Sequence, residues 1–262
     1  MTRTEHWVNF LDKTAKLLPT ERDRDFFLRV YKTSEDVYRR RLRGIGFLNM
    51  ESVLDAGCGF GQWSIALASL NKEVHSVELD ADRLRTAKCV AQETGAKNIT
   101  FMQGNIEEIA AKDESFDAIF CYSVIYYTDF RKTLREFFRL LKPKGKLYFS
   151  TNGLGWYIHN IIDKPYPSAD FDPRQIAIET IKNSFEFFRK GDKTEPGSIV
   201  MPRHIVIEAL VEAGFNKIIA DGEGKINSVK DDVPPISFFK ESYYGEEGVY
   251  EILCEKQALK GT

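Results

Sequence analysis

Several features that would assign this protein to a specialised class are missing or scarce. Its four cysteines are widely spaced and form no C-x-x-C pair, so the sequence predicts neither a zinc knuckle nor a disulfide framework and favours a reduced, cytosolic setting. No apolar run approaches about 18 residues, and the first residues form no unbroken apolar segment, which argues against membrane insertion and export. The formal net charge is only −2, without the positive field expected of a general nucleic-acid binder.

The sequence does have the material for a large buried core. Of its 262 residues, 43% are hydrophobic and 13% are aromatic. This length fits one enlarged α/β domain better than two equal domains. We therefore predict a single domain with additions.

The hydrophobic pattern changes near residue 50. Residues 5–48 carry apolar side chains at helical intervals, in two groups that Pro19-Thr20 separates. Beyond them, short apolar or β-branched runs alternate with amphipathic stretches, which is typical of βαβ units and a parallel sheet with helices in the gaps. Strands are expected at Ser52–Asp55, Val74–Glu78, Ile99–Gln103, Asp117–Tyr122, Leu147–Ser150, Phe215–Ala220 and Val249–Cys254.

Two helices and an insertion complete the expected arrangement. One helix is predicted at Arg131–Leu141, and another begins at Pro202 and stops at Gly214. Residues 153–200 carry many aromatic side chains among prolines and charges, and we interpret them as an inserted helical cap. The later stretch that contains Pro234-Pro235 and Tyr243-Tyr244 is expected to be a long ordered loop.

The most informative segment is Val53-Leu-Asp-Ala-Gly-Cys-Gly-Phe-Gly-Gln-Trp63, where a strand ends and a helix begins at once. Glycine permits positive φ and lets a ligand lie directly on the main chain. The helix start beyond it presents free N–H groups to an anionic group, such as a carboxylate. Nicotinamide and flavin enzymes also use a glycine turn, normally G-x-G-x-x-G. Here the third glycine comes one residue early, and Gln62 stands where that fingerprint has its last glycine.

The pattern Asp-x-Gly-x-Gly-x-Gly after a first strand resembles motif I of class I, Rossmann-like S-adenosylmethionine-dependent methyltransferases. The resemblance continues in register. Glu78 ends the second strand 17 residues beyond Gly61, where the family keeps an acidic residue that accepts hydrogen bonds from both ribose hydroxyls. Asn105 follows the third strand at the family's adenine-contacting position, where Asp is commoner.

Three further segments extend the resemblance, which covers residues 50–152 closely and 201–255 loosely. They look like the family's fourth strand, its fifth strand with the preceding helix end, and the lead into its sixth strand: Ser115–Ser123, Leu140–Thr151 and Glu212–Phe215.

The resemblance implies a fold and a cofactor. The fold is α/β: a Rossmann-like, mostly parallel seven-stranded sheet with helices on both faces, an N-terminal helical extension and an inserted helical cap after strand five. In domains, residues 1–49 form the extension, 50–152 and 201–262 the S-adenosylmethionine-binding domain, and 153–200 the substrate-recognition cap. The cofactor is S-adenosyl-L-methionine. The residues expected to hold it are Asp55, Gly57, Cys58, Gly59, Gly61, Trp63, Glu78, Leu79, Asn105, Ile106, Cys121 and Arg43.

Arg43 enters that set on a separate argument. Arg39-Arg40-Arg41 and Arg43 form a basic cluster shortly before the first strand. One interpretation is a solvated helix face. The other is that Arg43 pairs with the donor's carboxylate or with an acidic substrate, which suits a forked guanidinium.

The methyl acceptor is expected at the carboxyl ends of the strands, where ligands on open parallel sheets collect. Transfer from a sulfonium mainly needs alignment and exclusion of water, so no metal or covalent nucleophile is required, although an alcohol acceptor would use a base. Ser123, Tyr126 and Tyr127 follow strand four, and Asn152, Trp156 and His159 follow strand five. We name His159, Tyr126 and Tyr127 as catalytic candidates. The alternatives are a structural or surface histidine and tyrosines that only form the pocket wall.

The acceptor class follows by elimination. The Asn/Asp-Pro-Pro-Tyr/Phe signature that resembles enzymes methylating amino groups of adenine or glutamine is missing after strand four, and so is the Pro-Cys nucleophile of cytosine-C5 enzymes. This leaves a small molecule with a hydroxyl or amine as the expected partner, with neither nucleic acid nor membrane. Two alternatives remain: a nicotinamide-dependent oxidoreductase, and a catalytically silent S-adenosylmethionine-binding module that acts through a protein partner. No oligomeric state is predicted.

Overall fold

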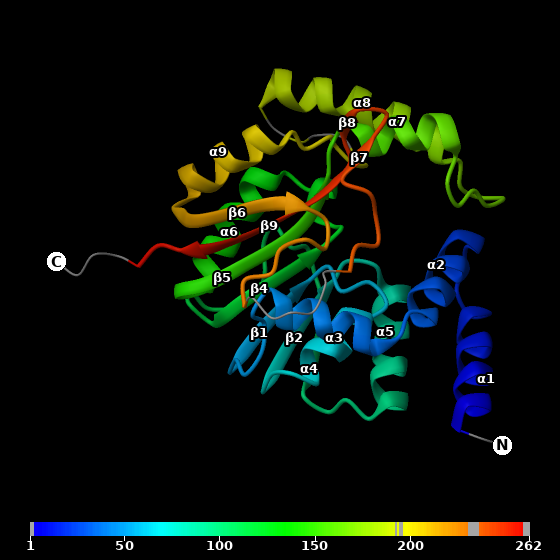
Figure 1. The fold of residues 1–262 in the computed structure, drawn as a ribbon. Helices are drawn as coiled ribbons and strands as arrows, with labels where there is room; N and C mark the ends of the chain where they lie inside the picture. Colours follow the sequence, from blue (N-terminus) through cyan, green and yellow to red (C-terminus); the bar gives the residue numbers. More distant parts are fainter. Residues whose placement is uncertain (1–2, 192, 194–195, 230–235, 259–262) are drawn as a thin grey trace.

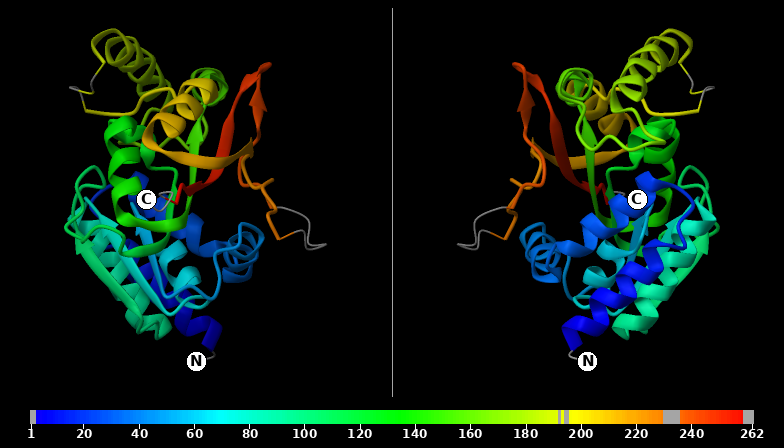
Figure 2. Two further views of the ribbon diagram at one scale, coloured as in Figure 1. Left: turned by 90° about the vertical axis from the view of Figure 1, so that its left-hand side faces the viewer. Right: turned by 90° about the vertical axis from the view of Figure 1, so that its right-hand side faces the viewer.

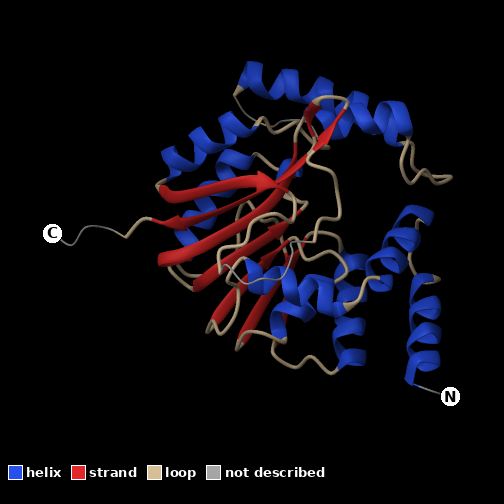
Figure 3. Ribbon diagram, in the orientation of Figure 1, coloured by secondary structure: helices blue, strands red, loops and turns tan. Residues whose placement is uncertain are grey.

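The computed structural model describes the chain except for residues 1–2, 192, 194–195, 230–235 and 259–262. A seven-stranded sheet lies at its centre, with helices on both faces (Figures 1 and 3). The strand order is β3-β2-β1-β4-β5-β9-β6, and β9 is antiparallel to both of its neighbours while the other pairs are parallel. The strands are β1 (Ser52–Ala56), β2 (Glu73–Glu78), β3 (Ile99–Gln103), β4 (Phe116–Tyr122), β5 (Leu141–Asn152), β6 (Phe215–Gly222) and β9 (Val249–Lys256).

The predicted strands are confirmed, and all but one agree with the structure to within two residues at each end. The exception is β5, which begins at Leu141 rather than Leu147. Leu141 pairs with Phe116 before the register shifts, and the Lys142 ammonium lies 2.7 Å from the Asp117 carboxylate. These contacts extend the strand back through residues that the sequence marks as a helix end.

The helices pack on the sheet through two separate cores. On one face α6 and α9 contribute Phe137 and Leu210 to a core under β1, β4 and β5. On the other face α3 and α4 contribute Leu42 and Trp63 to a second core. The helices are α1 (Arg3–Ala15), α2 (Glu21–Lys32), α3 (Glu35–Gly44), α4 (Gln62–Ala68), α5 (Ala81–Thr94), α6 (Phe130–Leu140), α7 (Leu154–Asp163), α8 (Pro173–Lys190) and α9 (Arg203–Ala213), with a 3-10 turn, η1, at Ile125–Tyr127.

The N-terminal region contains one helix more than the two groups of apolar residues indicate. A break occurs at Thr33 and Ser34, where the Ser34 hydroxyl accepts a hydrogen bond from the Asp36 N–H and caps α3. Serine is a preferred N-cap, so the signal was present in the sequence. The spacing of the apolar residues by itself did not indicate the break between α2 and α3.

Two other expectations about local structure were wrong. No helix fills the gap between β3 and β4: residues 104–115 form turns, and the Arg139 guanidinium donates to the carbonyls of Ile109 and Ala111. The stretch expected to be a loop contains a small hairpin of β7 (Ser242–Tyr243) and β8 (Glu246–Glu247). Pro234 and Pro235 lie outside the described residues.

The first helix and the longest helix of the expected cap lie far apart in the molecule. Helix α1 lies at one end and α8 at the other in all three orientations (Figures 1 and 2). Helices α7 and α8 occupy the region expected to be a helical cap. Within the described residues, no helix has the length and apolar character to cross a membrane.

Candidate functional site

The glycine turn after β1 is fixed to the end of β2 by backbone hydrogen bonds. The N–H groups of Gly57 and Cys58 both donate to the Val77 carbonyl, at 2.8 and 2.9 Å. Gly57, Gly59 and Gly61 all have positive φ, at 83°, 55° and 85°. This conformation is unfavourable for any residue with a side chain.

The three glycines differ in what surrounds them. A Cβ on Gly57 would lie 2.6 Å from the Val124 side chain, and one on Gly61 would lie 3.0 Å from the Ala87 Cβ. A Cβ on Gly59 would have nothing within 4 Å. Gly57 and Gly61 are therefore required by packing, whereas the α-carbon of Gly59 faces open space in which a ligand can lie against the main chain.

The Glu78 carboxylate joins the glycine turn to the turn that follows β2. Its Oε2 accepts the N–H of Gly59 at 2.8 Å, and its Oε1 accepts the N–H of Asp80 at 2.9 Å. Each carboxylate oxygen has a second acceptor position, so the group can still receive two hydroxyl donors. Leu79 beside it is 68% exposed and offers an apolar surface. These residues fit an adenosyl ligand: a bare main chain, a bidentate acceptor and an apolar contact lie together.

Asp55 lies beneath the turn. Its carboxylate is buried and accepts a hydrogen bond from the Ser64 hydroxyl at 2.6 Å, which in turn accepts from Ser76 at 2.9 Å. Burial raises the pKa of Asp55 to about 7; the Ser64 hydrogen bond opposes that rise, and the charge of Glu78 adds to it. Asp55 thus connects β1 to α4, and its effect on a ligand would pass through the position of the turn.

Four other residues expected at the cofactor have side chains in the packed core: Cys58, Trp63, Ile106 and Cys121. The Trp63 ring lies 4.6 Å from Tyr38 and 4.8 Å from Phe120. Burial raises the pKa of both thiols, so neither is poised to be a thiolate. Any contact of these residues with a ligand would be made by the main chain.

Asn105 lies after β3, as expected for the adenine-contacting position. It is exposed, and its side-chain carbonyl accepts a hydrogen bond from the Glu107 N–H at 3.0 Å. This Asx turn holds the side chain at the carboxyl edge of the sheet, near the end of β2 with which β3 pairs.

A cluster of polar and aromatic groups lies at the carboxyl ends of β4 and β5. The rings of Tyr126 and Tyr127 are 4.6 Å apart. Burial raises the pKa of Tyr126, as do Tyr127 and Tyr157, while a hydrogen bond with Asn152 opposes the rise. Tyr157 donates to the Ile199 carbonyl at 3.3 Å. Tyr127 is 44% exposed, so its side chain reaches solvent where the others do not.

Tyr157 is the member of this cluster that the sequence analysis missed. Its signal is positional: α7 begins directly after β5, so its first turns lie over the strand ends. The hydroxyls of Tyr126 and Tyr157 both lie near the Asn152 amide. We call Tyr126, Tyr127, Asn152 and Tyr157 the tyrosine cluster.

His159 does not join the tyrosine cluster. It follows Tyr157 by two residues on α7, which places it on a different face of the helix. Its ring stacks on Tyr243 of the hairpin at 4.3 Å, and its Nδ1 lies 2.6 Å from the Asp163 carboxylate. The arrangement favours the structural interpretation of His159 and separates it from Tyr126 and Tyr127.

The structure divides the basic cluster of α3. Arg43 is exposed in the last turn of α3, which leads to the amino end of β1 and away from the glycine turn. Arg39 pairs with Glu35 and Asp36 on the helix surface. The expectation that Arg43 meets the donor is thus not supported, because the helix carries it toward the opposite end of the sheet. The solvated-face interpretation fits Arg39 and Arg43, but it is wrong for Arg41.

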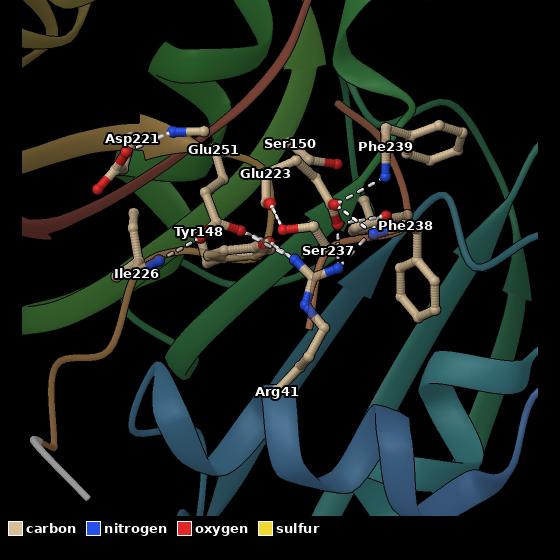
Figure 4. A network of polar contacts seen from close by, with 12 residues as sticks. Arg41, Tyr148, Ser150, Asp221, Glu223, Ile226, Ser237, Phe238, Phe239 and Glu251 are labelled. Atoms are coloured by element: carbon tan, nitrogen blue, oxygen red, sulfur yellow. Dashed lines mark hydrogen bonds and ion pairs between the residues drawn. The ribbon is translucent and has the colours of Figure 1, made fainter. Parts of the chain in front are cut away.

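Arg41 is buried between two glutamates (Figure 4). Its guanidinium contacts Glu223 and lies 2.9 Å from Glu251. It also donates to the Tyr148 hydroxyl at 2.8 Å, while Tyr148 donates to Glu251 at 2.6 Å and Tyr122 donates to Glu223 at 2.7 Å. We call these five residues the Arg41 network; it joins α3, β4, β5, β9 and the loop after β6.

The Arg41 network also fixes the loop that follows β6. The Glu223 carboxylate accepts the N–H groups of Phe238 at 2.7 Å and Phe239 at 3.2 Å, and Glu251 accepts the Ile226 N–H at 2.6 Å (Figure 4). The Phe239 ring then packs on Trp156 of α7, at 5.3 Å between centroids. Sequence analysis missed this network because its partners are up to 210 positions apart.

Comparison with known proteins identifies the family to which the chain belongs. Residues 49–187 match the sequence profile of a family described as a methyltransferase domain. The chain is 37% identical over 95 residues to an uncharacterized methyltransferase, YcgJ, of Bacillus subtilis, covering 36% of this chain and 38% of that protein. It is 32% identical over 117 residues to demethylmenaquinone methyltransferase of Lactococcus lactis (43% and 46% covered) and 33% over 116 residues to ubiquinone biosynthesis O-methyltransferase of Klebsiella pneumoniae (42% and 48%). Each match spans less than half of the relative's own length.

Solved structures resemble the fold over most of the chain. The YcgJ structure from Bacillus subtilis aligns with a TM-score of 0.54 and 18% identity, covering 87% of this chain and all of that one. The cyclase SpnF aligns with a TM-score of 0.58 and 16% identity, covering 86% of this chain and 81% of that one. At these identities the likeness shows the fold alone.

Proposed function

The chain belongs to the methyltransferase-domain family, and from that premise we propose that it transfers a methyl group from S-adenosylmethionine to a hydroxyl or amine of a small molecule. The observation that carries the proposal is the junction of the glycine turn with Glu78. The Gly59 N–H donates to the Glu78 carboxylate, so the open space beside the Gly59 α-carbon adjoins a carboxylate that still has unused acceptor positions.

The donor side uses groups that bind without reacting. S-adenosylmethionine, when bound, supplies a sulfonium-activated methyl group. Glu78 would accept the two ribose hydroxyls, the main chain at Gly57–Gly59 would lie against the donor, and Leu79 would contact its apolar surface. Asn105 would reach the base from the end of β3. The task of these residues is to orient the donor and to exclude water.

The acceptor side is the tyrosine cluster. Its described groups are hydroxyls and an amide, so it would position a neutral hydroxyl or amine by hydrogen bonds and ring contacts. Tyr127 is the member that reaches solvent and is therefore our candidate for the first contact with an incoming acceptor. One relative is named for demethylmenaquinone, a small molecule, and another for O-methylation in ubiquinone biosynthesis, which supports this class.

Calorimetric titration with S-adenosylhomocysteine tests the donor site. The wild-type chain is expected to bind it and to give no heat with NAD. Glu78→Ala should abolish binding because the sugar loses its acceptor. The matched control is Glu73→Ala, at the exposed amino end of the same strand, which should bind like wild type. A wild-type chain that binds NAD and ignores S-adenosylhomocysteine would establish the oxidoreductase alternative instead.

Turnover separates an enzyme from a silent binding module. Release of labelled methyl from the donor, measured against a panel of hydroxylated and amine-bearing metabolites, should identify at least one acceptor. Tight donor binding with no transfer to any class of small molecule would favour a module that acts through a protein partner.

A further inference from the structure

The amino end of α2 is held by a residue from the loop between α7 and α8. The Asp170 carboxylate accepts the N–H of Glu21 at 2.8 Å and the N–H of Arg22 at 3.1 Å. Thr20, the residue before the helix, accepts the N–H of Asp23 at 3.0 Å. The first three N–H groups of the helix are therefore satisfied, two of them by a side chain nearly 150 residues away in the sequence.

This capping is complete only while the loop is docked. A helix begins with N–H groups that have no partner within it, and an anion near them is stabilising. The Arg24 N–H reaches the Thr20 carbonyl at 3.2 Å, so it needs no further partner. If the loop leaves, the N–H groups of Glu21 and Arg22 lose their acceptor.

Three more contacts hold the loop on the same helix. The Ala169 N–H donates to the Glu21 carboxylate at 3.1 Å. The guanidinium of Arg22 lies 4.0 Å from the centre of the Phe171 ring, and that of Arg29 lies 4.1 Å from the Tyr166 ring. Arg22 and Arg29 are two turns apart and share one face of α2. We call residues 166–171 together with this face of α2 the clasp.

The other side of α2 contacts the glycine turn. The Tyr31 hydroxyl donates to the Phe60 carbonyl at 2.7 Å, and the Phe27 ring lies 5.3 Å from the Phe60 ring. Phe60 is the residue between Gly59 and Gly61. The Arg83 guanidinium, 2.6 Å from Asp23, lies over the Phe60 ring as well. Helix α2 thus contacts residues 166–171 on one face, from Glu21 to Arg29, and the glycine turn on its inner face.

Figure 1 shows the same relation in space: the loop after α7 extends toward α2 on the side to which the parallel strands point. The clasp and the ends of the strands therefore lie on the same side of the molecule.

We propose that the clasp couples the segment expected to bind the acceptor to the turn that binds the donor, with Asp170 as a positioning residue that acts through α2. This inference rests on the proposed function. Docking of the loop holds α2, and α2 holds Phe60 and the turn in the conformation that accepts the donor. Coupling is reciprocal, so a ligand on the turn strengthens the clasp in return.

The test uses S-adenosylhomocysteine as the probe and amide hydrogen exchange as the second readout. In wild type, binding should slow exchange at Glu21 and Arg22. Asp170→Ala should weaken binding by about fivefold to tenfold, the range that loss of a helix cap allows. Asp170→Asn should restore only part of the affinity, because its single side-chain oxygen can accept one of the two N–H groups while its NH2 group cannot accept the other.

Asp172→Ala is the matched control. Asp172 lies two residues beyond Asp170 and caps α8, within its own segment, by accepting the Arg174 N–H. It should leave S-adenosylhomocysteine affinity and exchange at α2 unchanged. If Asp170→Ala fails to fold, Arg22→Gln gives the second measurement, since it removes the cation from Phe171 and keeps the backbone contacts.

The outcomes separate the two proposals. A wild-type chain that does not bind S-adenosylhomocysteine overturns the proposed function. If the wild-type chain binds S-adenosylhomocysteine, Asp170→Ala binds it with equal affinity, and amide exchange at α2 does not change, then only the proposed coupling through the clasp is overturned. If Asp170→Ala and Asp172→Ala lose the same affinity for S-adenosylhomocysteine, the loss comes from a general weakening of the loop, which also contradicts the proposal.

Discussion

Comparing Gly59→Ala with Gly95→Ala separates two effects of a glycine substitution. Both variants strain the backbone, but only Gly59→Ala places a methyl group where the donor is expected to lie. Both glycines have positive φ, 55° and 77°, and at both an added Cβ would have nothing within 4 Å. Replacing either with alanine should cost roughly 1–2 kcal/mol of unfolding free energy, the penalty of a left-handed conformation. The two variants should therefore lose similar stability in urea denaturation.

Donor binding should distinguish the same two variants. The Gly59 methyl would occupy the space in which the donor lies on the main chain, so affinity for S-adenosylhomocysteine should fall more than about tenfold, at least about 1.4 kcal/mol. Gly95 is the C-cap of α5, so Gly95→Ala should bind S-adenosylhomocysteine like wild type. Calorimetric titration of both variants checks this. Wild-type affinity in Gly59→Ala, or an equal loss in Gly95→Ala, would refute the assignment of this surface to the donor.

Two predictions concern the buried charges. Arg41→Met leaves two buried carboxylates without their cation and should lower the unfolding free energy by about 3–5 kcal/mol in urea denaturation. Arg43→Met, on the exposed face, should change it by less than about 0.5 kcal/mol. Equal losses of stability in the two variants would contradict the role of the Arg41 network. Asp55→Asn should remove a pH dependence: since burial raises the pKa of Asp55 from 3.8 to about 7, the folded state keeps a proton that the unfolded state releases, and wild-type stability falls as pH rises between those values. The variant should therefore gain relative to wild type across that interval and not above it, and parallel stability curves from pH 4 to 8 would contradict this cause.

The strand-turn-helix unit that contains the glycine turn was predictable because its signals are local. The glycines and Glu78 follow strands whose apolar runs are continuous, and the register between them is short enough to count along the chain. The same holds for α9, where Pro202 and Gly214 mark both ends. Each of these features depends on residues within one or two elements.

The rest depends on contacts that no local pattern contains. Arg41 and Arg43 look equivalent in the sequence, and only the partners Glu223 and Glu251 distinguish them. His159 looked like a base because it follows a strand end, but the face of α7 and the hairpin at Tyr243 decide its surroundings. The loop residue Asp170 carries no motif, and its role emerges only when α2 lies beside it.

A crystal structure with S-adenosylhomocysteine tests the central claim most directly. We predict that the ribose hydroxyls lie within hydrogen-bond distance of Glu78 and that the ligand contacts the main chain at Gly57–Gly59. A complex in which the ligand occupies a different part of the molecule, with Glu78 still bound only to the backbone, would contradict the account.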